Sequence, residues 1–374
     1  MKFTVNTRVL REALNPLLLA IDSRVVVPAL ENFLFQVEGR VARITSSNLS
    51  ISMVTTVNIE RSKTDRVDVC IPARILLDTL KSLEDEPVDF VFDHNLHSFE
   101  IISEEGRYKM ATVRAADYPK LPVPADSKRI EISKEELMEA IHHTSLCVST
   151  DVLRPAMCGI YAHGSNGRLV FASTDGHRLS KFVTDAHGME DGIIIPKKAM
   201  TILQVLLKDC PTESVELKYS SMNLFVEVGD TMVIARLIDE RFPAYESVIP
   251  TEHSISMVVN RHSLVDSLKR ISLYANRSTS QIQLVIIGDG LRIESDDADF
   301  GKEAEEALII EHSGDDMTIG FNARLLLELT QNHSSESLVM KFTAPNKACI
   351  IQVPEKKDSQ SLVMLMPVML NQTA

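Results

Sequence analysis

Residues 194–209 read IIPKKAMTILQVLLKD, a short apolar strand that continues into an amphipathic helix. Pro196 suits the first helical turn, where its missing N–H leaves no hydrogen bond unmade. Apolar residues recur at the three-to-four-residue spacing of one buried helix face, at Met200, Leu203, Leu206 and Leu207. The opposite stripe of this helix contains no acid and consists of Lys197, Thr201, Gln204 and Lys208. In a chain of net charge -13, an acid-free stripe indicates an anionic partner.

Length and composition are those of a folded protein with more than one domain. The chain has 374 residues, of which 44% are hydrophobic, and this favours two or three domains. Its five cysteines are odd in number, widely spread and without a C-x-x-C pair, so we expect small core residues in a reducing compartment. No apolar run is long enough to span a bilayer, and the first residues do not form a signal peptide. We therefore expect a cytoplasmic protein.

The chain contains an internal threefold repeat. Three segments align with one another, namely residues 3–10, 130–137 and 257–264. The markers Leu10, Leu137 and Leu264 are separated by equal intervals of 127 residues (137 minus 10 and 264 minus 137). In each copy a short strand meets Asn or Ser at a helix N-cap position, and a helix follows.

Two further markers repeat in the same order. Residues 73–78 read ARILLD and residues 323–328 read ARLLLE, 250 positions apart (323 minus 73), and both resemble the start of the helix near residue 197. The pairs Tyr118-Pro119, Phe242-Pro243 and Met366-Pro367 then close the three copies at intervals of 124 residues (242 minus 118 and 366 minus 242). Three ordered markers in three copies indicate three units of one kind.

Each unit reads as strand, helix, several strands, helix and several strands. Alternating patterns such as VDFVF at 88–92 and LFVEV at 224–228 predict half-buried strands. With two helices and many strands per unit, the helices are expected to cover one face of an antiparallel sheet. Linkers are expected where proline and small polar residues gather, at 121–127 and 248–254. The prediction is an α+β chain of three similar domains with the ranges 1–125, 126–252 and 253–374.

Basic residues occur on or near the six predicted helices. They are Arg8, Arg11, Arg74, Lys81, Lys134, Lys197, Lys198, Lys208, Lys269, Arg270 and Arg324. The densest acidic run lies elsewhere, from Glu294 to Glu306. One amphipathic helix of mixed charge is ordinarily just a solvated surface. Six related helices that lean basic in an acidic chain favour a polyanion as partner, although acids dilute the basic face at Asp78, Glu135, Glu139, Asp266 and Glu328.

Three local stretches point to a family. Residues 174–179 read TDGHRL, residues 239–250 read DERFPAYESVIP, and residues 365–370 read LMPVML. Together with the threefold repeat they resemble the bacterial DNA polymerase III beta subunit family, the sliding clamps. The corresponding family signatures are T-D-G-H-R-L, D-G-R-F-P-x-Y-x-x-V-[IL]-P and V-M-P-M-R-L. The resemblance covers the whole chain.

This resemblance implies a DNA clamp fold in which two chains close head to tail into a ring, with helices lining the hole and sheets outside. Such a heterologous contact closes only if the rotation per subunit allows it. The ring would encircle duplex DNA without reading its sequence and would act as a processivity factor. A basic lining that touches phosphates is sufficient for this role. By resemblance the DNA-facing residues are Arg24, Arg74, Lys197 and Lys198.

The resemblance also implies a pocket that binds short peptide motifs of the polymerase catalytic subunit, the clamp loader and repair proteins. Its residues would be Arg154, Met157, Thr174, Gly176, His177, Arg178, Leu179, Pro243, Val248, Met364, Met366, Pro367, Val368, Met369 and Leu370. Met and Leu side chains repack around varied apolar anchors, which suits a site with many partners. Two departures from the family bear on peptide preference: Met369 stands where a basic residue is frequent, and residues 371–374 extend past the usual end.

For the ring contact, the resemblance implies an apolar patch at each end of the chain. Tyr108 and Met110 would form one patch, and Leu273 and Tyr274 the other. The acidic run from Glu294 to Glu306 would then face Arg107, Lys109 and Lys81 of the neighbouring copy, which adds orientation more than affinity. A core position on an edge strand is the alternative interpretation of Tyr108 and Met110.

An enzyme built around Asp175 and His177 is the competing hypothesis. His177 lacks an H-E-x-x-H or H-x-D context, and His142 and His143 are adjacent on a helix and so are expected to point apart. There is no G-x-S-x-G sequence and no glycine-rich phosphate loop. A sequence-specific regulator would need a helix-turn-helix pattern, and none occurs. We therefore expect a non-catalytic protein without metal or cofactor.

Overall fold

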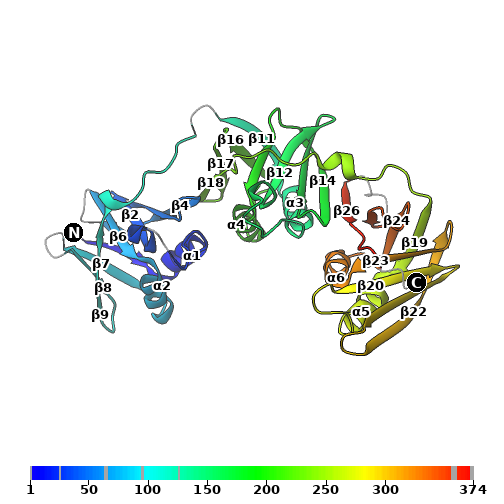
Figure 1. The fold of residues 1–374 in the computed structure, drawn as a ribbon. Helices are drawn as coiled ribbons and strands as arrows, with labels where there is room; N and C mark the ends of the chain where they lie inside the picture. The colour runs from blue at the N-terminus through cyan, green and yellow to red at the C-terminus, as the bar shows by residue number, and fades with distance from the viewer. Residues whose placement is uncertain are drawn as a thin grey trace. The chain divides into compact units, whose positions relative to one another are not determined.

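The computed structural model of the chain describes residues 2–24, 27–62, 66–93, 97–124, 127–354 and 360–370. The chain divides into two compact units, and Figure 1 shows its helices and strands along the sequence. The first unit consists of Met1–Met138 and Lys198–Leu237, and the second of Glu139–Lys197 and Ile238–Ala374. All three boundaries between the units fall in the middle sequence repeat, so the three predicted domain ranges stay a prediction.

Six α-helices occur in the described part of the chain, two in each sequence repeat, as the sequence predicts. They are α1 (Thr7–Leu17), α2 (Ala73–Ser82), α3 (Lys134–Ser145), α4 (Lys197–Lys208), α5 (Arg261–Ile271) and α6 (Ala323–Gln331). The N-caps are also those predicted: the side chains of Asn6 and Asn260 accept hydrogen bonds from backbone N–H groups of the first helical turn. Ser133 Oγ likewise accepts from the N–H of Glu136 at 3.2 Å. These caps satisfy donors that the helix itself leaves unpaired.

The first unit contains two antiparallel sheets. One has the strand order β5-β1-β7-β8-β9 and the other the order β10-β6-β2-β3-β4-β18-β17-β16-β11. The strands are β1 (Lys2–Asn6), β2 (Asn32–Glu38), β3 (Val41–Ser47), β4 (Ile51–Asn58), β5 (Arg61–Ser62), β6 (Arg66–Pro72), β7 (Pro87–Asp93), β8 (Ser98–Ile102), β9 (Arg107–Ala111), β10 (Val113–Arg114), β11 (Lys128–Ser133), β16 (Ser214–Tyr219), β17 (Asn223–Val228) and β18 (Thr231–Arg236).

The second unit contains one large antiparallel sheet. Its order is β15-β12-β13-β14-β26-β25-β24-β19-β22-β21-β20-β23. The strands are β12 (Gly159–Ser165), β13 (Arg168–Thr174), β14 (Arg178–His187), β15 (Ile193–Pro196), β19 (Ile255–Asn260), β20 (Gln281–Ile287), β21 (Gly290–Asp297), β22 (Lys302–Ser313), β23 (Met317–Asn322), β24 (Ser337–Phe342), β25 (Cys349–Gln352) and β26 (Ser361–Leu365).

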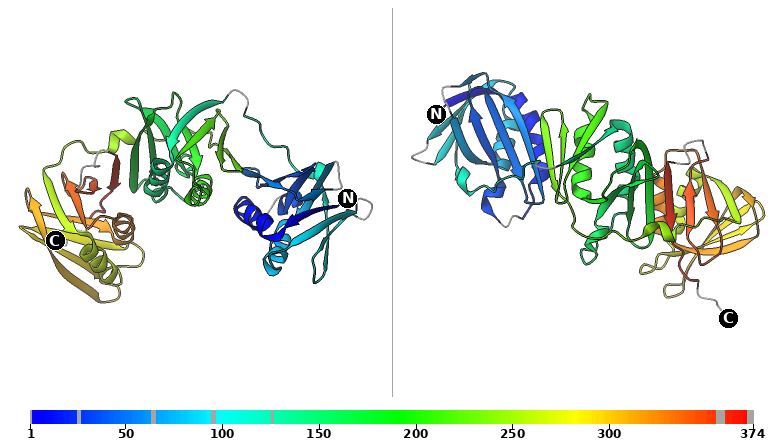
Figure 2. Two further views of the ribbon diagram at one scale, coloured as in Figure 1. Left: turned by 180° about the vertical axis from the view of Figure 1, so that it is seen from behind. Right: turned by 90° about the horizontal axis from the view of Figure 1, so that it is seen from above.

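Two strand pairings join neighbouring sequence repeats. In the first unit β4 pairs with β18, from Ile51 opposite Ala235 to Thr55 opposite Thr231. In the second unit β14 pairs with β26, and the two strands lie side by side in Figures 1 and 2. Because main-chain hydrogen bonds cross from one repeat to the next, the sheets are longer than any single repeat supplies.

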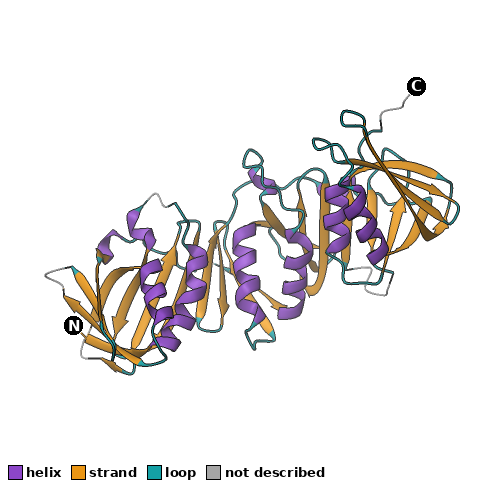
Figure 3. Ribbon diagram, turned by 90° about the horizontal axis from the view of Figure 1, so that it is seen from below, coloured by secondary structure: helices purple, strands orange, loops and turns teal. Residues whose placement is uncertain are grey.

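The helices cover one face of the sheets, in agreement with the α+β prediction. Helices α1 and α2 contact each other, and so do α5 and α6; each of these pairs also contacts strands of its unit (Figure 3). Leu10, Leu14 and Leu17 of α1 are fully buried. Burial of each such side chain contributes about 1.5–3 kcal/mol, so the apolar stripe is what holds the helix layer to the sheet.

Helix α4 differs in detail from its prediction. Pro196 is the last residue of β15, and α4 starts at Lys197, so Pro196 precedes the helix instead of lying in its first turn. Met200 and Leu203 are buried as expected. Leu206 is only partly buried, and Ala199 and Ile202 take up the buried face. Leu207 is buried as predicted, so the buried face of α4 consists of Ala199, Met200, Ile202, Leu203 and Leu207.

The five cysteines are free thiols. Cys70, Cys147 and Cys349 are buried core residues, as predicted, whereas Cys158 and Cys210 are only partly buried. Burial raises the pKa of the Cys70 and Cys147 thiols to about 12.

Candidate functional site

The TDGHRL stretch forms a tight turn between β13 and β14. The Oδ1 atom of Asp175 accepts the N–H groups of His177 and Arg178, both at 2.9 Å, and Gly176 has a φ of +90°. A residue with a side chain is strained at this φ, which explains the glycine. Thr174 Oγ1 accepts the N–H of Gly176 at 3.1 Å and donates to the carbonyl oxygen of Arg178 at 2.8 Å. The turn therefore uses most of the polar atoms of its own motif.

Arg178 ties this turn to α6. Its side chain is 11% exposed; Nε lies 2.9 Å from Asp175 Oδ2, and Nη1 lies 2.6 Å from Glu328 Oε2. Burial works against the charged guanidinium, but the hydrogen bonds and charges of Glu328 and Asp175 outweigh it and raise the pKa of Arg178. In the sequence Glu328 stands out as an acid that dilutes the basic helix face, and the structure shows that this carboxylate is paired with the turn.

The C-terminal segment passes directly beside the turn. Leu179 lies opposite Met364 in the pairing of β14 with β26, and the N–H of Met366 donates to the carbonyl oxygen of His177 at 2.8 Å. The segment then reaches the far edge of the same sheet, where the N–H of Val368 donates to the carbonyl oxygen of Gly320 at 2.9 Å. Residues 371–374, the predicted tail extension, lie outside the described residues.

Gly320 leaves space for the end of this segment. A Cβ atom built on Gly320 would lie 2.6 Å from Leu370 Cδ2 and 2.7 Å from the carbonyl oxygen of Val368. Leu370 and Val368 are partly buried, as is Pro367, whereas Met369 is 80% exposed and Met366 is partly open to solvent. The position that departs from the family pattern, Met369, is thus a solvent-facing side chain.

The remaining predicted pocket residues come from two loops of the second unit. Arg154 precedes the short 3-10 helix that ends at Met157, and its Nη1 would lie 3.1 Å from a Cβ on Gly176. Pro243 lies just before a second 3-10 helix, Tyr245–Val248, which ends at Val248. Phe242 and Tyr245 pack in one apolar cluster with Leu179 and Met364. The structure therefore brings all three sequence signatures of the predicted pocket into one region of the second unit.

The predicted DNA-facing residues lie on or next to helices. Arg74 is exposed on α2, Arg24 is exposed in the loop that follows α1, and Lys197 and Lys198 begin α4. Lys198 Nζ lies 2.5 Å from Asp22 Oδ1 in the same unit. Asp22 is a functional candidate that the sequence alone does not reveal, because no local pattern links two residues that are 176 positions apart.

The predicted contact patches are at surface positions. Tyr108 and Met110 belong to β9, the last strand of the five-stranded sheet, and Tyr108 is exposed. Leu273 and Tyr274 follow α5, and Leu273 is 72% exposed. The acidic run is partly paired within its own chain: Arg270 holds Glu306 through two hydrogen bonds of 2.7 Å, and Arg292 lies 2.6 Å from Glu294.

The enzyme hypothesis finds no support in the geometry. Asp175 is occupied by the turn and by Arg178, and His177 is exposed. Among the described residues, no group of three His, Cys, Asp or Glu side chains is placed to hold a metal ion. The rings of His142 and His143 are nevertheless close, with centroids 5.5 Å apart, contrary to the expectation that they point apart. The helices of the described part are too short or too polar to cross a membrane.

Comparison with known proteins covers nearly the whole chain. Residues 1–122, 131–244 and 246–367 match, respectively, the N-terminal, central and C-terminal domains of the DNA polymerase III beta subunit. The beta sliding clamp of Pseudomonas putida is 26% identical over 98% of this chain and 100% of the relative. That of Vibrio cholerae is 25% identical over 99% of this chain and 100% of the relative.

Solved structures agree with the sequence match. The DNA polymerase III subunit beta of Pseudomonas aeruginosa has a TM-score of 0.93 at 25% identity and covers 99% of this chain and 100% of its own. A sliding clamp from Bartonella birtlesii bound to griselimycin has a TM-score of 0.91 at 26% identity, with 99% and 100% coverage. The threefold repeat, the two helices in each repeat and the full-length matches lead to one conclusion. The chain belongs to the DNA polymerase III beta subunit family, the sliding clamps of DNA replication.

Proposed function

We propose that two copies of this chain close head to tail into a ring around duplex DNA and hold the replicative polymerase there. The family assigns the chain the role of a processivity clamp; the ring, its lining and its peptide pocket are our proposal for how this chain performs that role. The main observation in favour of the ring is a pair of strand edges with opposite charge, one on β9 and one on β22.

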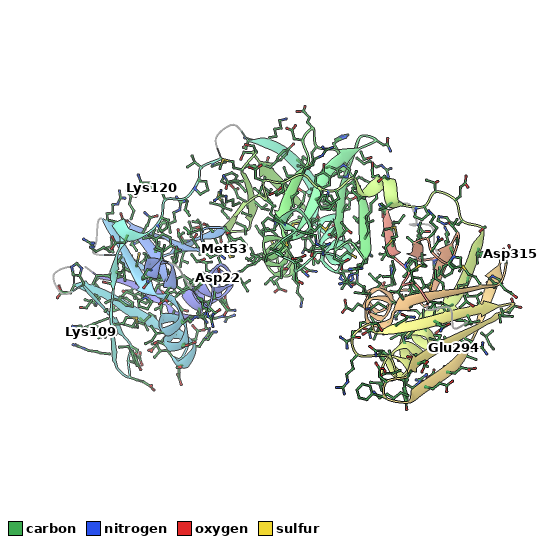
Figure 4. All side chains as sticks on the ribbon, viewed as in Figure 1. Asp22, Met53, Lys109, Lys120, Glu294 and Asp315 are labelled. Carbon is green, nitrogen blue, oxygen red and sulfur yellow. The ribbon has the colours of Figure 1, made fainter. Side chains whose placement is uncertain are left out.

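The two edges are complementary in hydrogen bonding and in charge. β9 ends its sheet, and residues 302–309 of β22 pair with β21 on one side only among the described strands. Exposed Arg107 and Lys109 lie on β9, and exposed Glu303 and Glu305 lie on β22 (Lys109 and Glu294 are labelled in Figure 4). An unpaired edge offers a row of free N–H and C=O groups to another strand. We infer that β9 of one copy pairs with β22 of the next.

Apolar side chains support the same contact. Tyr108 and Met110 alternate with the two bases on β9, so they face the opposite side of that strand. Exposed Leu273 and Tyr274 would meet them from the neighbouring copy. The charged pairs then orient the contact, while the apolar side chains supply most of its stability.

The helix layer is proposed to face the DNA. Arg24, Arg74, Lys197 and Lys198 would contact phosphates, and phosphate contacts position a protein without reading sequence. A lining of this kind permits sliding because the phosphate backbone looks alike at every register. The net charge of -13 argues against a basic coat over the whole surface.

The peptide pocket is proposed to lie around the TDGHRL turn and the C-terminal segment. The Met366 to Leu370 segment and the turn come together there, and the exposed Met side chains suit partners of varied apolar sequence. The sliding clamp relatives solved with griselimycin support a ligand-binding site in this family. The expected partners are the polymerase catalytic subunit, the clamp loader and repair proteins. We propose a non-catalytic role, because both carboxylate oxygens of Asp175 accept hydrogen bonds within the turn. A clamp on replicating DNA is proposed to act in the cytoplasm.

The ring is tested by comparing how long the protein stays on circular DNA and on linearised DNA. After loading by a clamp loader, the protein is expected to stay on a closed circle and to leave once the circle is cut. Equal retention on both forms would exclude topological binding. Lys197→Glu with Lys198→Glu is expected to weaken retention without loss of folding, and unchanged retention would count against the proposed lining.

A further inference from the structure

Asp22 holds one of the proposed DNA-contacting lysines on the protein surface. Its Oδ1 atom lies 2.5 Å from Lys198 Nζ, and its Oδ2 atom accepts a hydrogen bond of 3.0 Å from Asn48 Nδ2. The side chains of Lys198 and Asp22 are 43% and 45% exposed, so solvent and ions can reach the pair. Figure 4 labels Asp22, which follows α1 in the chain.

The carboxylate of Asp22 is held in position by the turn between β3 and β4 of the nine-stranded sheet. Asn48 Oδ1 accepts the N–H groups of Ser50 and Ile51 at 3.1 and 2.8 Å, so its amide group is oriented by the backbone. This turn leads directly into β4, and the carbonyl oxygen of Ser50 accepts the N–H of Arg236 at 2.8 Å. Both oxygens of Asp22 are thereby engaged, and the hydrogen bond from Lys198 lowers the pKa of Asp22, so the carboxylate is ionised at neutral pH.

We propose that Asp22 is a built-in competitor of the DNA phosphates for Lys198. This inference rests on the proposed DNA-facing role of α4. A lysine that is already paired with a carboxylate adds little to the salt-dependent attraction for DNA. A phosphate can bind this lysine only after it has displaced the carboxylate. Because an exposed ion pair is weak, Asp22 reduces the contribution of Lys198 to DNA binding without abolishing it, and Asp22 takes Lys198 back when the phosphate leaves. Asp22 would thus keep the lining from gripping the duplex.

A double-mutant cycle with Asp22→Asn and Lys198→Ala tests this inference. The full-length chain is titrated with a short fluorescent duplex, and binding is followed by anisotropy over a range of NaCl concentrations. Asp22→Asn is expected to bind about 3- to 10-fold more tightly at low salt, with a log–log salt slope steeper by about one. Lys198→Ala is expected to change the affinity little in the wild-type chain and clearly in the Asp22→Asn chain.

Asp117→Asn is the matched control, because Asp117 is also 45% exposed and is paired with Arg114 at 3.3 Å. It removes the same charge at another place and is expected to leave DNA binding nearly unchanged. Equal tightening by Asp117→Asn and Asp22→Asn would overturn the inference, since net charge alone would then account for the gain. Unchanged or weaker binding by Asp22→Asn would overturn it as well.

Two further variants keep the outcome interpretable. Thermal unfolding of Asp22→Ser and Asp22→Asn first shows that both variants are folded. Asp22→Ser is then expected to bind DNA more tightly, as Asp22→Asn does. Weaker binding by folded Asp22→Ser would count against competition. Lys197→Glu tests the proposed lining independently of Asp22. If Lys197→Glu weakens binding and Asp22→Asn has no effect, the inference fails while the proposed function stands. If neither variant changes binding, α4 is not a DNA contact, and the inference fails together with the proposed lining.

Discussion

The guanidinium of Arg178 on β14 donates a 2.6 Å hydrogen bond to the carboxylate of Glu328 on α6, 150 residues later in the chain. This bond links a turn of the proposed peptide pocket to a helix of the layer proposed to face DNA. Arg178 is also bound to Asp175, so two carboxylates depend on one cation.

Loss of Arg178 should therefore cost more than loss of Glu328. Arg178→Ala is expected to lower the free energy of unfolding by about 2–3 kcal/mol, because largely buried Asp175 and half-exposed Glu328 both lose their side-chain donor. Glu328→Gln is expected to cost under about 1 kcal/mol, since Glu328 is half exposed and the amide oxygen still accepts a hydrogen bond. Urea unfolding measures both, and equal losses would contradict this difference.

Stability should fall with acid between pH 6.5 and about 4 because of two histidines. Burial lowers the pKa of His143 and of His333 to about 4; the neighbouring His142 adds to the effect at both, as does Arg261 at His333. The unfolded chain takes up protons on these groups below pH 6.5, whereas the folded chain does so only near pH 4. The unfolded state then binds more protons in this window, so stability decreases as the pH falls through it.

Variants of these histidines provide the measurement. His143 stacks on Phe182 with ring centroids 5.4 Å apart, and its Nδ1 atom is buried without a hydrogen-bond partner in the described part of the structure. His143→Phe is expected to flatten the stability profile between pH 6.5 and 4 in chemical unfolding experiments. His177→Asn, at an exposed position, serves as the control substitution. If the stability of His143→Phe still depends on pH as steeply as that of the unmodified chain, His143 does not contribute to the acid sensitivity.

Binding of clamp-binding peptides should depend on the fit of Leu370 over Gly320. Leu370→Ala is expected to weaken peptide affinity about tenfold, as truncation of an apolar anchor does. Gly320→Ala is expected to weaken it through the backbone, because the new Cβ would clash with Leu370 and with the carbonyl oxygen of Val368. Competition titrations measure the first effect, and hydrogen exchange at the Val368 N–H measures the second.

Gly290→Ala on β21 is the control for this pair, because its Cβ would approach only the Ile287 carbonyl oxygen, at 3.3 Å. Unaltered peptide affinity in Leu370→Ala would reject the pocket assignment.

The ring contact should be broken by a charge at its apolar centre. Leu273→Asp is expected to give a monomer in native mass spectrometry at micromolar concentration, whereas the unmodified chain gives a dimer. Leu273 is 72% exposed in the single chain, so the substitution should leave its thermal unfolding almost unchanged. Ile287→Asp, at another exposed apolar position, is the control that should stay dimeric. A dimer in Leu273→Asp would contradict the proposal that this patch holds the two copies together.

Local features are predictable from the sequence because they depend on nearby residues. The N-caps at Asn6, Ser133 and Asn260 follow from short-range hydrogen bonding, and the threefold repeat locates all six helices. The prediction that Pro196 lies inside the first helical turn is wrong, because the same proline geometry fits the end of a strand before a helix. Boundaries of this kind depend on the pairing partner of the strand as well as on local preference.

Long-range partners are not predictable from one sequence. The pairs of Lys198 with Asp22 and of Arg178 with Glu328 join side chains that are 176 and 150 residues apart, and no spacing rule relates them. The pocket signatures are recognisable by resemblance, but only the fold shows that the TDGHRL turn shares a main-chain hydrogen bond with Met366. The pairing of β4 with β18 likewise depends on strand edges that the alternation pattern does not distinguish.

The pairings that join repeats also have a mechanical consequence. To pull β4 away from β18, or β14 away from β26, a load must rupture a whole ladder of main-chain hydrogen bonds at once. The proposed seam between copies also pairs two strand edges, β9 with β22, but the charged side chains along it are exposed, so the attraction across it weakens with salt. In a closed ring of two such chains, high salt would therefore open a seam between copies before it parts β4 from β18 or β14 from β26.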